Sequence, residues 1–199
     1  MWGDFLVAEG LVDPDKHKAL NEHYYQQYQQ GQLDIAEYLS FALGPMAGMT
    51  PETLSALQDK FLKKHVEPIL LDAAFDLLQA HRVNGDTLII ITATNTLVTQ
   101  PVADRLGVEH LIGCEAELKD GRYTGKPEGV PSFGEGKVRR IKSWCAEHQI
   151  LFEDAVFYSD SHNDLPLLRE VARAIAVDPD DLLRVEAQQC GWEIISLRP

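Results

Sequence analysis

Two kinds of hydrophobic periodicity divide the chain near residue 67. Over residues 2–66 apolar side chains recur at helical spacing, and the predicted helices cover residues 13–30 and 33–42, with a third beginning at Thr50. Two of these starts pair a capping residue with a following proline, as Asp13-Pro14 and Thr50-Pro51, which is the order that a helix N-terminus favours. Residues 1–67 are therefore predicted to form a small helical domain.

Beyond residue 67 the pattern changes to short apolar runs, rich in β-branched residues, that alternate with helical segments. Such alternation predicts a Rossmann-like parallel sheet covered by helices, and so an α/β fold for residues 68–199. Asp120-Gly121, at the centre of residues 116–125, predicts a short hairpin inserted between two of the strands. The runs expected to be strands are residues 87–92, 110–114, 155–158, 174–177 and 193–195.

Composition excludes several classes of partner. The 199 residues carry a formal net charge of −13, whereas a protein that binds duplex nucleic acid or an anionic membrane needs a face rich in Lys and Arg. The cysteines are far apart, which supports neither a disulfide framework nor a zinc site. The sequence has no targeting segment and no apolar run approaching ~18 residues. We therefore predict a soluble protein of the reducing cytoplasm.

The first candidate for chemistry is Thr92, which ends the apolar run 89–91. Open parallel sheets bind ligands at the carboxyl ends of their strands, so a hydroxyl group there is placed to hold a phosphate oxygen. The free N–H groups at the start of the next helix would add positive potential. The alternative is structural: Thr92 is an ordinary β-branched strand residue and Asn95 an ordinary helix cap.

The second candidate is Lys137, which follows the glycine-rich entry 133–136 to a predicted helix. A lysine in the first turn opposes the helix dipole, so an anionic partner explains its position better than helix stability does. The alternative is a solvated lysine. Pro131 and Arg139 occupy positions where a nucleoside-triphosphate loop and a dinucleotide-binding turn need glycine, which excludes both of those motifs.

The third and strongest candidate is a pair of aspartates, Asp160 and Asp164, just after the apolar run 156–158. Asp160 ends the predicted strand and Asp164 lies near the start of the next helix. This spacing lets both carboxylates converge on one hard cation. The alternative is a pair of helix caps around a tight turn, because acidic residues are common where a strand turns into a helix.

Taken together, the three candidates resemble the later motifs of the haloacid dehalogenase superfamily, in the same order and at compatible separations. Thr92 matches the hydroxyl residue of the second motif, and Lys137 matches the lysine of the third. Ser159-Asp160 with Asn163-Asp164 resembles the fourth motif, G-D-x-x-N-D, with serine in the glycine position. The segments around Lys137 and Asp160 look especially like bacterial hydrolases of subfamily IB, which are often labelled phosphoserine or histidinol-phosphate phosphatases.

The resemblance implies a Mg²⁺-dependent phosphatase in which a helical cap domain, residues 1–67, covers a core domain, residues 68–199. In such an enzyme Asp160 would bind Mg²⁺ directly. Asp164 would either bind the metal or orient another ligand, and Asn163 would position phosphate or water. The implied cofactor is Mg²⁺, and the implied partner is a small phosphorylated metabolite.

The resemblance also implies a reaction through a phosphoaspartate, which water then hydrolyses. Lys137 would offset negative charge on that intermediate. The hydroxyl group of Thr92 and the N–H of Ala93 would bind phosphoryl oxygens that carry charge in the transition state. These three residues are the predicted substrate-binding groups, and Lys137, Thr92 and Asn163 the predicted catalytic ones.

The motif that should begin such a chain is missing. Families of this kind start with a strand ending in D-x-D-x-T, whose first aspartate attacks phosphorus, and no such sequence occurs here. Asp13-Pro14-Asp15 and Asp178-Pro179-Asp180 have the D-x-D spacing but are interpreted as helix caps. We therefore expect a chain truncated before its first motif, by a misassigned start codon or by trimming, and inactive by itself.

The resemblance places that missing strand at the centre of the sheet, between the strands bearing Thr92 and Asp160. Each backbone group left unpaired in a buried edge costs ~1 to 3 kcal/mol, against a domain stability of ~5 to 15 kcal/mol. We therefore expect the chain alone to fold poorly, or to close the gap by joining the two strands or borrowing an edge.

Two other functional classes stay open. A binding or regulatory protein without the nucleophile would keep the fold and the Mg²⁺ site, whereas a helical interaction protein would use residues 2–66 and have no need of Asp160 or Asp164. Substrate choice would depend on cap tyrosines, which either line a pocket or merely pack. His162 is interpreted as a solvated loop histidine. The tyrosines are Tyr24, Tyr25, Tyr28 and Tyr38.

Overall fold

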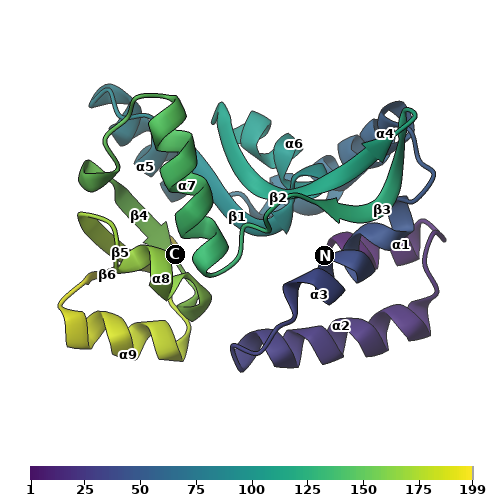
Figure 1. The fold of residues 1–199 in the computed structure, drawn as a ribbon, viewed down its shortest axis with the longest axis horizontal. Helices are drawn as coiled ribbons and strands as arrows, with labels where there is room; N and C mark the ends of the chain where they lie inside the picture. The colour runs from purple at the N-terminus through teal and green to yellow at the C-terminus, as the bar shows by residue number, and fades with distance from the viewer. Residues whose placement is uncertain (199) are drawn as a thin grey trace.

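The N-terminal part of the protein is helical, as its periodicity predicts (Figure 1). The structure, a computed structural model, describes residues 1–198. Asp13 caps α2 by accepting a hydrogen bond from the N–H of Lys16 at 2.9 Å, and Thr50 caps α4 through the N–H of Thr53 at 3.3 Å. Both predicted helix starts are confirmed. The helices are α1 (Trp2–Ala8), α2 (Pro14–Gln29), α3 (Ile35–Leu43) and α4 (Pro51–Phe61), followed by the short turns η2 (Leu62–Val66) and η3 (Glu67–Ile69); η1 (Gly44–Met46) lies between α3 and α4.

Every apolar run expected to be a strand contributes to one, and the α/β class is confirmed. The strands form two three-stranded sheets rather than the expected single sheet. In the first sheet β1 pairs parallel to β2, and β2 pairs antiparallel to β3; in the second, β4, β5 and β6 are parallel. The strands are β1 (Ile89–Asn95), β2 (His110–Lys119), β3 (Arg122–Glu128), β4 (Val156–Ser159), β5 (Arg173–Val177) and β6 (Glu193–Ile195).

The predicted hairpin is present, and it docks on the helical part. Asp120 and Gly121 have φ angles of 49° and 73°, and two positive values in succession fit the tight turn that joins twisted antiparallel strands. The N–H of Gly48 donates a hydrogen bond to the carbonyl of Tyr123 at 2.8 Å, and the N–H of Tyr123 donates to the carbonyl of Met49 at 2.9 Å. The first arm of the hairpin is continuous with the strand predicted at 110–114, because β2 extends to Lys119.

Strands β1 and β4 each have an unpaired inner edge. Within residues 1–198, β1 pairs only with β2, and β4 pairs only with β5. Ile91 on β1 and Phe157 on β4 pack against the same apolar cluster, so the two edges belong to one layer of the molecule. In Figure 1 both strands lie beneath α7 (Glu135–Glu147), and no third strand separates them. Of the alternatives considered for this gap, direct joining of β1 to β4 does not occur.

The helical part and the first sheet share a hydrophobic core. Phe5 and Leu39 from the helices pack in one cluster with Leu97 and Cys114 from the sheet region. Two further clusters lie beneath α7 and around β5. The cap boundary at residue 67 therefore stays a prediction, because packing continues across it. The remaining helices are α5 (Asp72–Val83), α6 (Thr96–Leu106), α8 (Leu165–Leu168) and α9 (Asp181–Cys190), with the turns η4 (Phe152–Asp154) and η5 (His162–Asp164).

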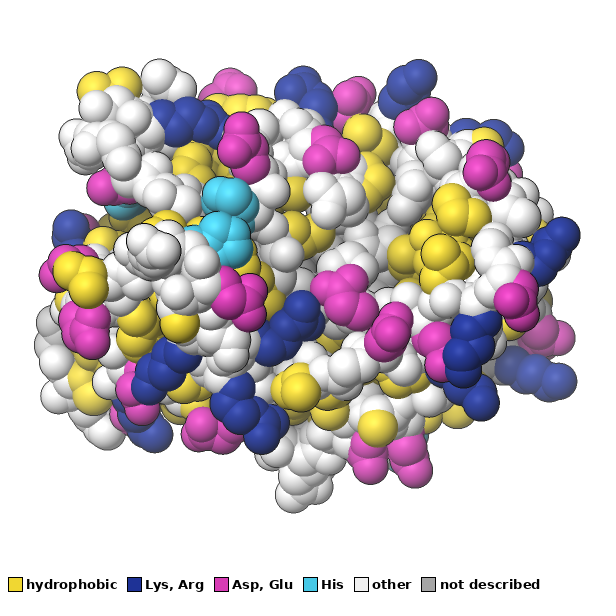
Figure 2. Space-filling model, turned by 45° about the horizontal axis from the view of Figure 1, so that its top comes forward, with side chains coloured by type: hydrophobic (Ala, Val, Ile, Leu, Met, Phe, Trp, Pro, Cys, Tyr) yellow, Lys and Arg dark blue, Asp and Glu magenta, His cyan; other side chains and the backbone are white. Residues whose placement is uncertain are grey.

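Helix α2 is the longest helix of the described chain and lies at its surface. None of its residues is buried, and it rests on α3 through aromatic contacts, with the ring centroids of Tyr24 and Phe41 at 5.3 Å and those of His17 and Phe41 at 5.5 Å. Among residues 1–198, no helix has both the length and the apolar character that crossing a membrane requires. Figure 2 shows acidic and basic side chains interspersed on one face of the molecule, without a continuous basic patch.

Candidate active site

A buried ion pair lies at the start of α7. The Nζ atom of Lys137 is 2.6 Å from Oδ1 of Asp164, and the two side chains are only 6% and 11% exposed. Glycine at position 136 allows the backbone of Pro131 to lie against this helix start, since a Cβ atom there would collide with the carbonyl oxygen of Pro131. The solvated-lysine alternative is therefore wrong. The helix start brings a positive charge into the interior, where a carboxylate from the second sheet meets it.

Ser159, which stands where the fourth motif has glycine, takes part in this arrangement. Its hydroxyl group donates a hydrogen bond of 2.7 Å to Oδ2 of Asp164 and accepts one from the N–H of Ser161 at 3.2 Å. Both oxygens of Asp164 are therefore engaged, one by Lys137 and one by Ser159. A carboxylate held from both sides has a fixed orientation.

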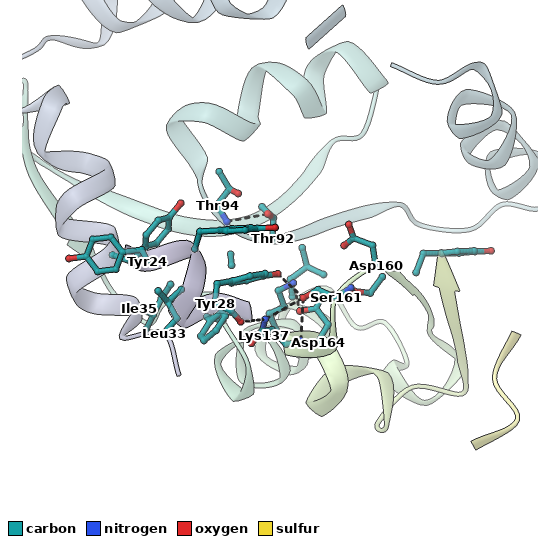
Figure 3. Close-up of a pocket in the computed structure, with 18 of the residues that line it drawn as sticks. Tyr24, Tyr28, Leu33, Ile35, Thr92, Thr94, Lys137, Asp160, Ser161 and Asp164 are labelled. Atoms are coloured by element: carbon teal, nitrogen blue, oxygen red, sulfur yellow. Dashed lines mark hydrogen bonds and ion pairs between the residues drawn. The ribbon is translucent and has the colours of Figure 1, made fainter. Parts of the chain in front are cut away.

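Asp160 is in a different position from Asp164. Its side chain is exposed, and Figure 3 draws no interaction between its carboxylate and the other residues around the cavity. Only its backbone carbonyl is tied down, by the N–H of Asp180 at 2.9 Å. Since one carboxylate is fixed to a lysine and the other is free, the two aspartates are not equivalent.

The donor atoms at this site are oxygens, the type of ligand that a hard cation prefers. Carboxylate oxygens are the protein ligands that Mg²⁺ prefers, and Mg²⁺ sites commonly use one or two of them together with waters and phosphate oxygens. Asp160 has the free carboxylate, and it would hold the ion directly. Within residues 1–198, no three His, Cys, Asp or Glu side chains come together as a complete metal cluster. Other oxygen atoms must therefore complete the coordination.

Thr92 lines the cavity, but the helix does not begin directly after it. Strand β1 continues to Asn95, and its register against β2 shifts between Ile91 and Asn95. The Oγ1 atom of Thr92 accepts a hydrogen bond from the N–H of Thr94 at 3.1 Å, and α6 starts only at Thr96. The expected turn into a helix directly after Thr92 is therefore wrong, because the chain remains extended for three more residues.

Asn95 does not act as the ordinary helix cap that the structural alternative requires. Its side chain is buried, makes no capping hydrogen bond to α6, and leaves its Oδ1 atom without a partner within the described chain. Ala93, whose N–H is the other predicted phosphate contact, lines the cavity beside Thr92.

The loop after β4 contacts the helical part through Asn163. The side-chain amide of Asn163 donates to the carbonyl of Tyr28 at 3.3 Å, and its backbone N–H donates to Oγ of Ser161 at 3.3 Å. The hydroxyl groups of Tyr28 and Ser161 share a hydrogen bond of 2.6 Å. Burial raises the pKa of Tyr28, so its phenol remains neutral in the physiological range. These contacts attach the end of α2 to the candidate metal loop.

His162 is not the solvated histidine expected from the sequence. Its side chain is 14% exposed, and its Nδ1 atom lies 2.8 Å from Oδ2 of Asp180. The backbone N–H of His162 donates to the same oxygen at 2.8 Å. Burial works to raise the pKa of Asp180, but hydrogen bonds from the N–H groups of Leu183 and His162 and the His162 ring outweigh it and lower the pKa. The pair anchors the loop to α9.

A cavity of about 410 Å³ lies between these elements (Figure 3). We call its two sides the core wall and the cap wall. The core wall comprises Thr92, Ala93, Lys137, Asp160 and Asp164. The cap wall comprises Asn21, Tyr24, Tyr28, Leu33, Ile35 and Tyr38, which come from α2, α3 and the segment between them. Every predicted site residue, Asn163 included, therefore lines this cavity.

The cap tyrosines divide between the two roles considered for them. Tyr24 and Tyr38 pack on each other edge to face, with ring centroids 5.8 Å apart, and both also line the cavity. Tyr28 lines the cavity and joins cap to core. Tyr25 is 54% exposed and lies at the rim. Packing and lining are therefore not alternatives for this group.

Among the cavity residues that the sequence did not single out, Tyr158 has the most distinctive contacts. The hydroxyl group of Tyr158, on β4, lies 2.7 Å from Nε2 of His81, and Nδ1 of His81 lies 2.7 Å from Oδ2 of Asp86. Tyr158 and His81 are far apart in the chain, and neither falls in a recognisable motif with the other. Only the folded arrangement brings them together.

Three comparisons with known proteins bear on this geometry. A family model described as haloacid dehalogenase-like hydrolase matches residues 2–169. A protein of Neisseria meningitidis named histidinol-phosphatase is 38% identical over 201 residues, which cover 99% of this chain and 90% of that protein. A Mycobacterium tuberculosis protein named phosphoserine phosphatase is 33% identical over 165 residues, which cover 83% of this chain and 54% of that protein.

A solved structure has the same fold over nearly the whole chain. It is a protein with unknown function from Bordetella pertussis, 40% identical, with a TM-score of 0.91, and the match covers 99% of this chain and 90% of that one. Several of the curated relatives are much longer than the segment they share with this chain, which spans about half of their length.

Proposed function

The chain belongs to the haloacid dehalogenase-like hydrolase family, and from this premise we propose that its cavity binds the phosphate group of a small phosphomonoester for Mg²⁺-dependent hydrolysis. Relatives that are named as phosphatases place it among the phosphatases of that family. The proposal further assigns roles to specific residues, names Mg²⁺ as the metal and gives a route for the reaction.

The observation that carries the proposal is the pairing of a fixed carboxylate with a free one. Lys137 and Asp164 form a buried ion pair at 2.6 Å, beside the exposed carboxylate of Asp160 in the same cavity. A purely structural ion pair needs no exposed neighbour of the same sign, since a second carboxylate adds repulsion. A metal ion and a phosphate group explain why Asp160 remains free.

Each side chain of the core wall has a distinct task in this proposal. Asp160 holds Mg²⁺, which when bound would neutralise charge on the phosphoryl oxygens. Asp164 keeps the Lys137 ammonium group aimed at the cavity, where it offsets negative charge. The Thr92 hydroxyl group and the Ala93 N–H donate hydrogen bonds to phosphoryl oxygens. Asn163 orients the loop and the bound water or phosphate.

The attacking group belongs to a strand that would pair with the inner edges of β1 and β4. Residues 1–198 contain no D-x-D-x-T sequence, and both edges offer unpaired backbone groups beside the cavity. A strand there would satisfy those groups, and an aspartate at its end would face Thr92 and Asp160. In the proposed route, phosphoryl transfer to that aspartate releases the alcohol of the substrate, and hydrolysis of the phosphoaspartate releases inorganic phosphate. We therefore expect no turnover where such an aspartate is lacking.

The substrate class comes from the relatives. One is named for histidinol phosphate and another for phosphoserine, and both compounds are phosphate esters with an amino group that are small enough in volume for a 410 Å³ cavity. We therefore propose a phosphorylated metabolite of this size as the substrate, and the cytoplasm as the compartment in which it is met.

Hydrolysis of p-nitrophenyl phosphate, with and without Mg²⁺, tests the proposal. The chain is compared with one extended by the in-frame residues encoded upstream, and with the extended chain carrying Asp160→Ala. We expect metal-dependent turnover only in the extended chain and its loss in the variant. Turnover by the unextended chain would show that the attacking group lies elsewhere.

A second function has one observation in its favour. The absence of D-x-D-x-T from the sequence fits a binding or regulatory protein that retains the cavity and the metal loop. Such a protein would bind phosphate and Mg²⁺ but show no turnover in either form of the chain. If alanine at Asp160 and Asp164 leaves the function unchanged, both proposals fail and a helical interaction protein is favoured.

A further inference from the structure

The cap wall contains no side chain that could pair with an anion. Asn21, Tyr24, Tyr25, Tyr28, Leu33, Ile35 and Tyr38 are the helical-part residues around the cavity, and all are uncharged. Among the lining residues of the described chain, Lys137 is the one basic side chain, and Asp164 already pairs with it at 2.6 Å. Counting Lys137 against Asp160 and Asp164, the lining carries a net charge of −1.

This charge distribution distinguishes two kinds of phosphate ester: those that also carry a carboxylate, and those that carry a cationic group instead. The phosphate group needs Lys137 and Mg²⁺ on the core wall. A carboxylate on the rest of the substrate would then enter the tyrosine side with no cation to pair with, and an unpaired charge in a partly desolvated site is unfavourable. An ammonium or imidazolium group would instead meet aromatic rings, which attract cations through their π faces.

The position of the tyrosines favours the second kind. Figure 3 shows Tyr24, Leu33 and Ile35 on the side of the cavity away from Asp160, with Tyr28 between them and the Lys137–Asp164 pair. A substrate whose phosphate contacts Lys137 therefore directs its other end past Tyr28 toward Tyr24 and Tyr38. Burial raises the pKa of Tyr38 as it does that of Tyr28, so these phenols add no negative charge but keep their polar hydroxyl groups.

We propose that the part of the substrate released with the alcohol is a cation without a carboxylate, and that Tyr24, Tyr28 and Tyr38 select it. This rests on the proposed phosphatase function and narrows it. Phosphate esters of amino alcohols fit the site. Phosphorylated amino acids that retain a free carboxylate do not.

A pair of probes isolates the carboxylate. Phosphoethanolamine and O-phosphoserine share the phosphate and the ammonium group and differ by one carboxylate. Titration calorimetry of the full chain with Mg²⁺ should give a Kd for phosphoethanolamine at least about fivefold lower than for O-phosphoserine, because the carboxylate of O-phosphoserine has no cation to pair with on the cap wall. Histidinol phosphate, which adds an imidazole ring, should bind more tightly than phosphoethanolamine.

Substitutions in the cap wall test which residues attract the cation. Tyr24→Leu should raise the Kd of phosphoethanolamine several-fold, because the ring that attracts the ammonium group is lost, whereas Tyr24→Phe, which keeps the ring, should retain most of the affinity. His23→Leu is the matched control, because His23 is the neighbouring aromatic residue on α2, 5.3 Å from Tyr24 between ring centroids, and does not line the cavity. It should leave the Kd of phosphoethanolamine unchanged.

A gain-of-function variant gives the reverse test without loss of a ring. Asn21 is exposed on α2 and lines the cavity, so Asn21→Arg places a cation on the cap wall with little effect on folding. This variant should bind O-phosphoserine at least as tightly as phosphoethanolamine. If the unmodified chain already binds O-phosphoserine equally or more tightly, the proposal is wrong.

Inorganic phosphate distinguishes failure of this inference from failure of the proposed function. If inorganic phosphate binds in the presence of Mg²⁺ but the probes show no preference, the core wall works as proposed and the selection by tyrosines is overturned. If inorganic phosphate does not bind, the phosphate site itself is wrong, and the selection falls with it.

Discussion

The core wall and the cap wall of the cavity differ in how their side chains are held. On the core wall, Lys137 and Asp164 are almost fully buried and are fixed by hydrogen bonds to each other and to Ser159. On the cap wall, Tyr24 and Tyr28 belong to a helix that buries no residue and depends on ring contacts and a few hydrogen bonds. The charged groups proposed for the reaction are thus held in the interior. The tyrosines proposed to contact the rest of the substrate lie on a surface helix that few contacts hold in place.

The core wall is therefore expected to be rigid and the cap wall to be adaptable. A buried charge pair cannot shift without a large cost, because each partner would be left unpaired. A surface helix can move when only a few contacts are broken. Elements of low local stability commonly cover binding sites. The comparison predicts that substitutions of the buried pair on the core wall, Lys137 and Asp164, change stability and chemistry together, while those on the cap wall change recognition with little effect on stability.

The largest expected effect comes from removing the buried cation. Lys137→Met leaves Asp164 buried and unpaired, which should lower the free energy of unfolding by ~3 to 5 kcal/mol. Urea denaturation followed by circular dichroism measures it. Lys142→Met is the control on the same helix: Lys142 pairs with Glu170 at 2.8 Å, but both side chains are 47% exposed, so its loss should cost at most ~1 kcal/mol. Equal effects of the two variants would contradict the difference between the walls.

The next effect separates the two aspartates. Asp160→Asn should leave the free energy of unfolding within ~0.5 kcal/mol, because the side chain is exposed, yet lower Mg²⁺-dependent turnover of the extended chain by at least ~100-fold. Asp164→Asn should lower both stability and turnover, since it loses half of a buried ion pair. Unfolding curves and p-nitrophenyl phosphate turnover are measured on the same preparations. A marked loss of stability in Asp160→Asn would show that its carboxylate is not free.

A smaller effect is expected at the junction of the walls. Tyr28→Phe removes the hydrogen bond to Ser161, which should weaken attachment of α2 to the loop by ~1 kcal/mol. Amide hydrogen exchange in α2 should rise several-fold, while that of β5 stays the same. Tyr25→Phe is the control, because its hydroxyl group is at the rim and only accepts a hydrogen bond from Gln29 within α2. Similar exchange in both variants would mean that the Tyr28 contact does not hold the helix.

The smallest effect is a pH dependence at the anchor of the loop. The pKa of Asp180 is lowered in the folded protein from its usual value of 3.8. Its contribution to stability is therefore present above pH ~4 and is lost as the pH falls through the lowered pKa. Asp180→Asn should flatten the fall of the urea midpoint between about pH 4 and pH 2.5. If the urea midpoint of this variant falls between about pH 4 and pH 2.5 as steeply as that of the unmodified protein, Asp180 is not the source of the acid sensitivity.

The sequence predicts the core wall better than the cap wall for a physical reason. Asp160 and Asp164 are neighbours in the chain after one strand, and Lys137 follows a glycine entry to a helix, so local patterns place them at the ends of their elements. The contact of Tyr28 with Ser161 spans 133 residues and depends on how α2 lies over the sheet. No local pattern encodes such a contact, because helical periodicity gives the face of a helix but not the partner it meets.

The fold shows the same limit. Periodicity predicts where strands lie, but the division into two sheets depends on backbone pairing between segments, which is not visible in the order of residues. The extension of β1 to Asn95 likewise follows from its register against β2, whereas the sequence placed a helix start directly after Thr92. The solvated interpretations of Lys137 and His162 were wrong for a related reason: their partners, Asp164 and Asp180, come from other elements.

The absence of buried residues in α2 also has an evolutionary consequence. Most substitutions at exposed helical positions change stability by less than ~0.5 kcal/mol, so residues 14–29 can accumulate changes that selection for folding does not remove. Position 136, where any Cβ atom would strike Pro131, has no such freedom. Neutral substitutions would therefore accumulate mainly in the helix that faces the proposed substrate. New substrate preferences could then arise while the buried charged residues stay unchanged.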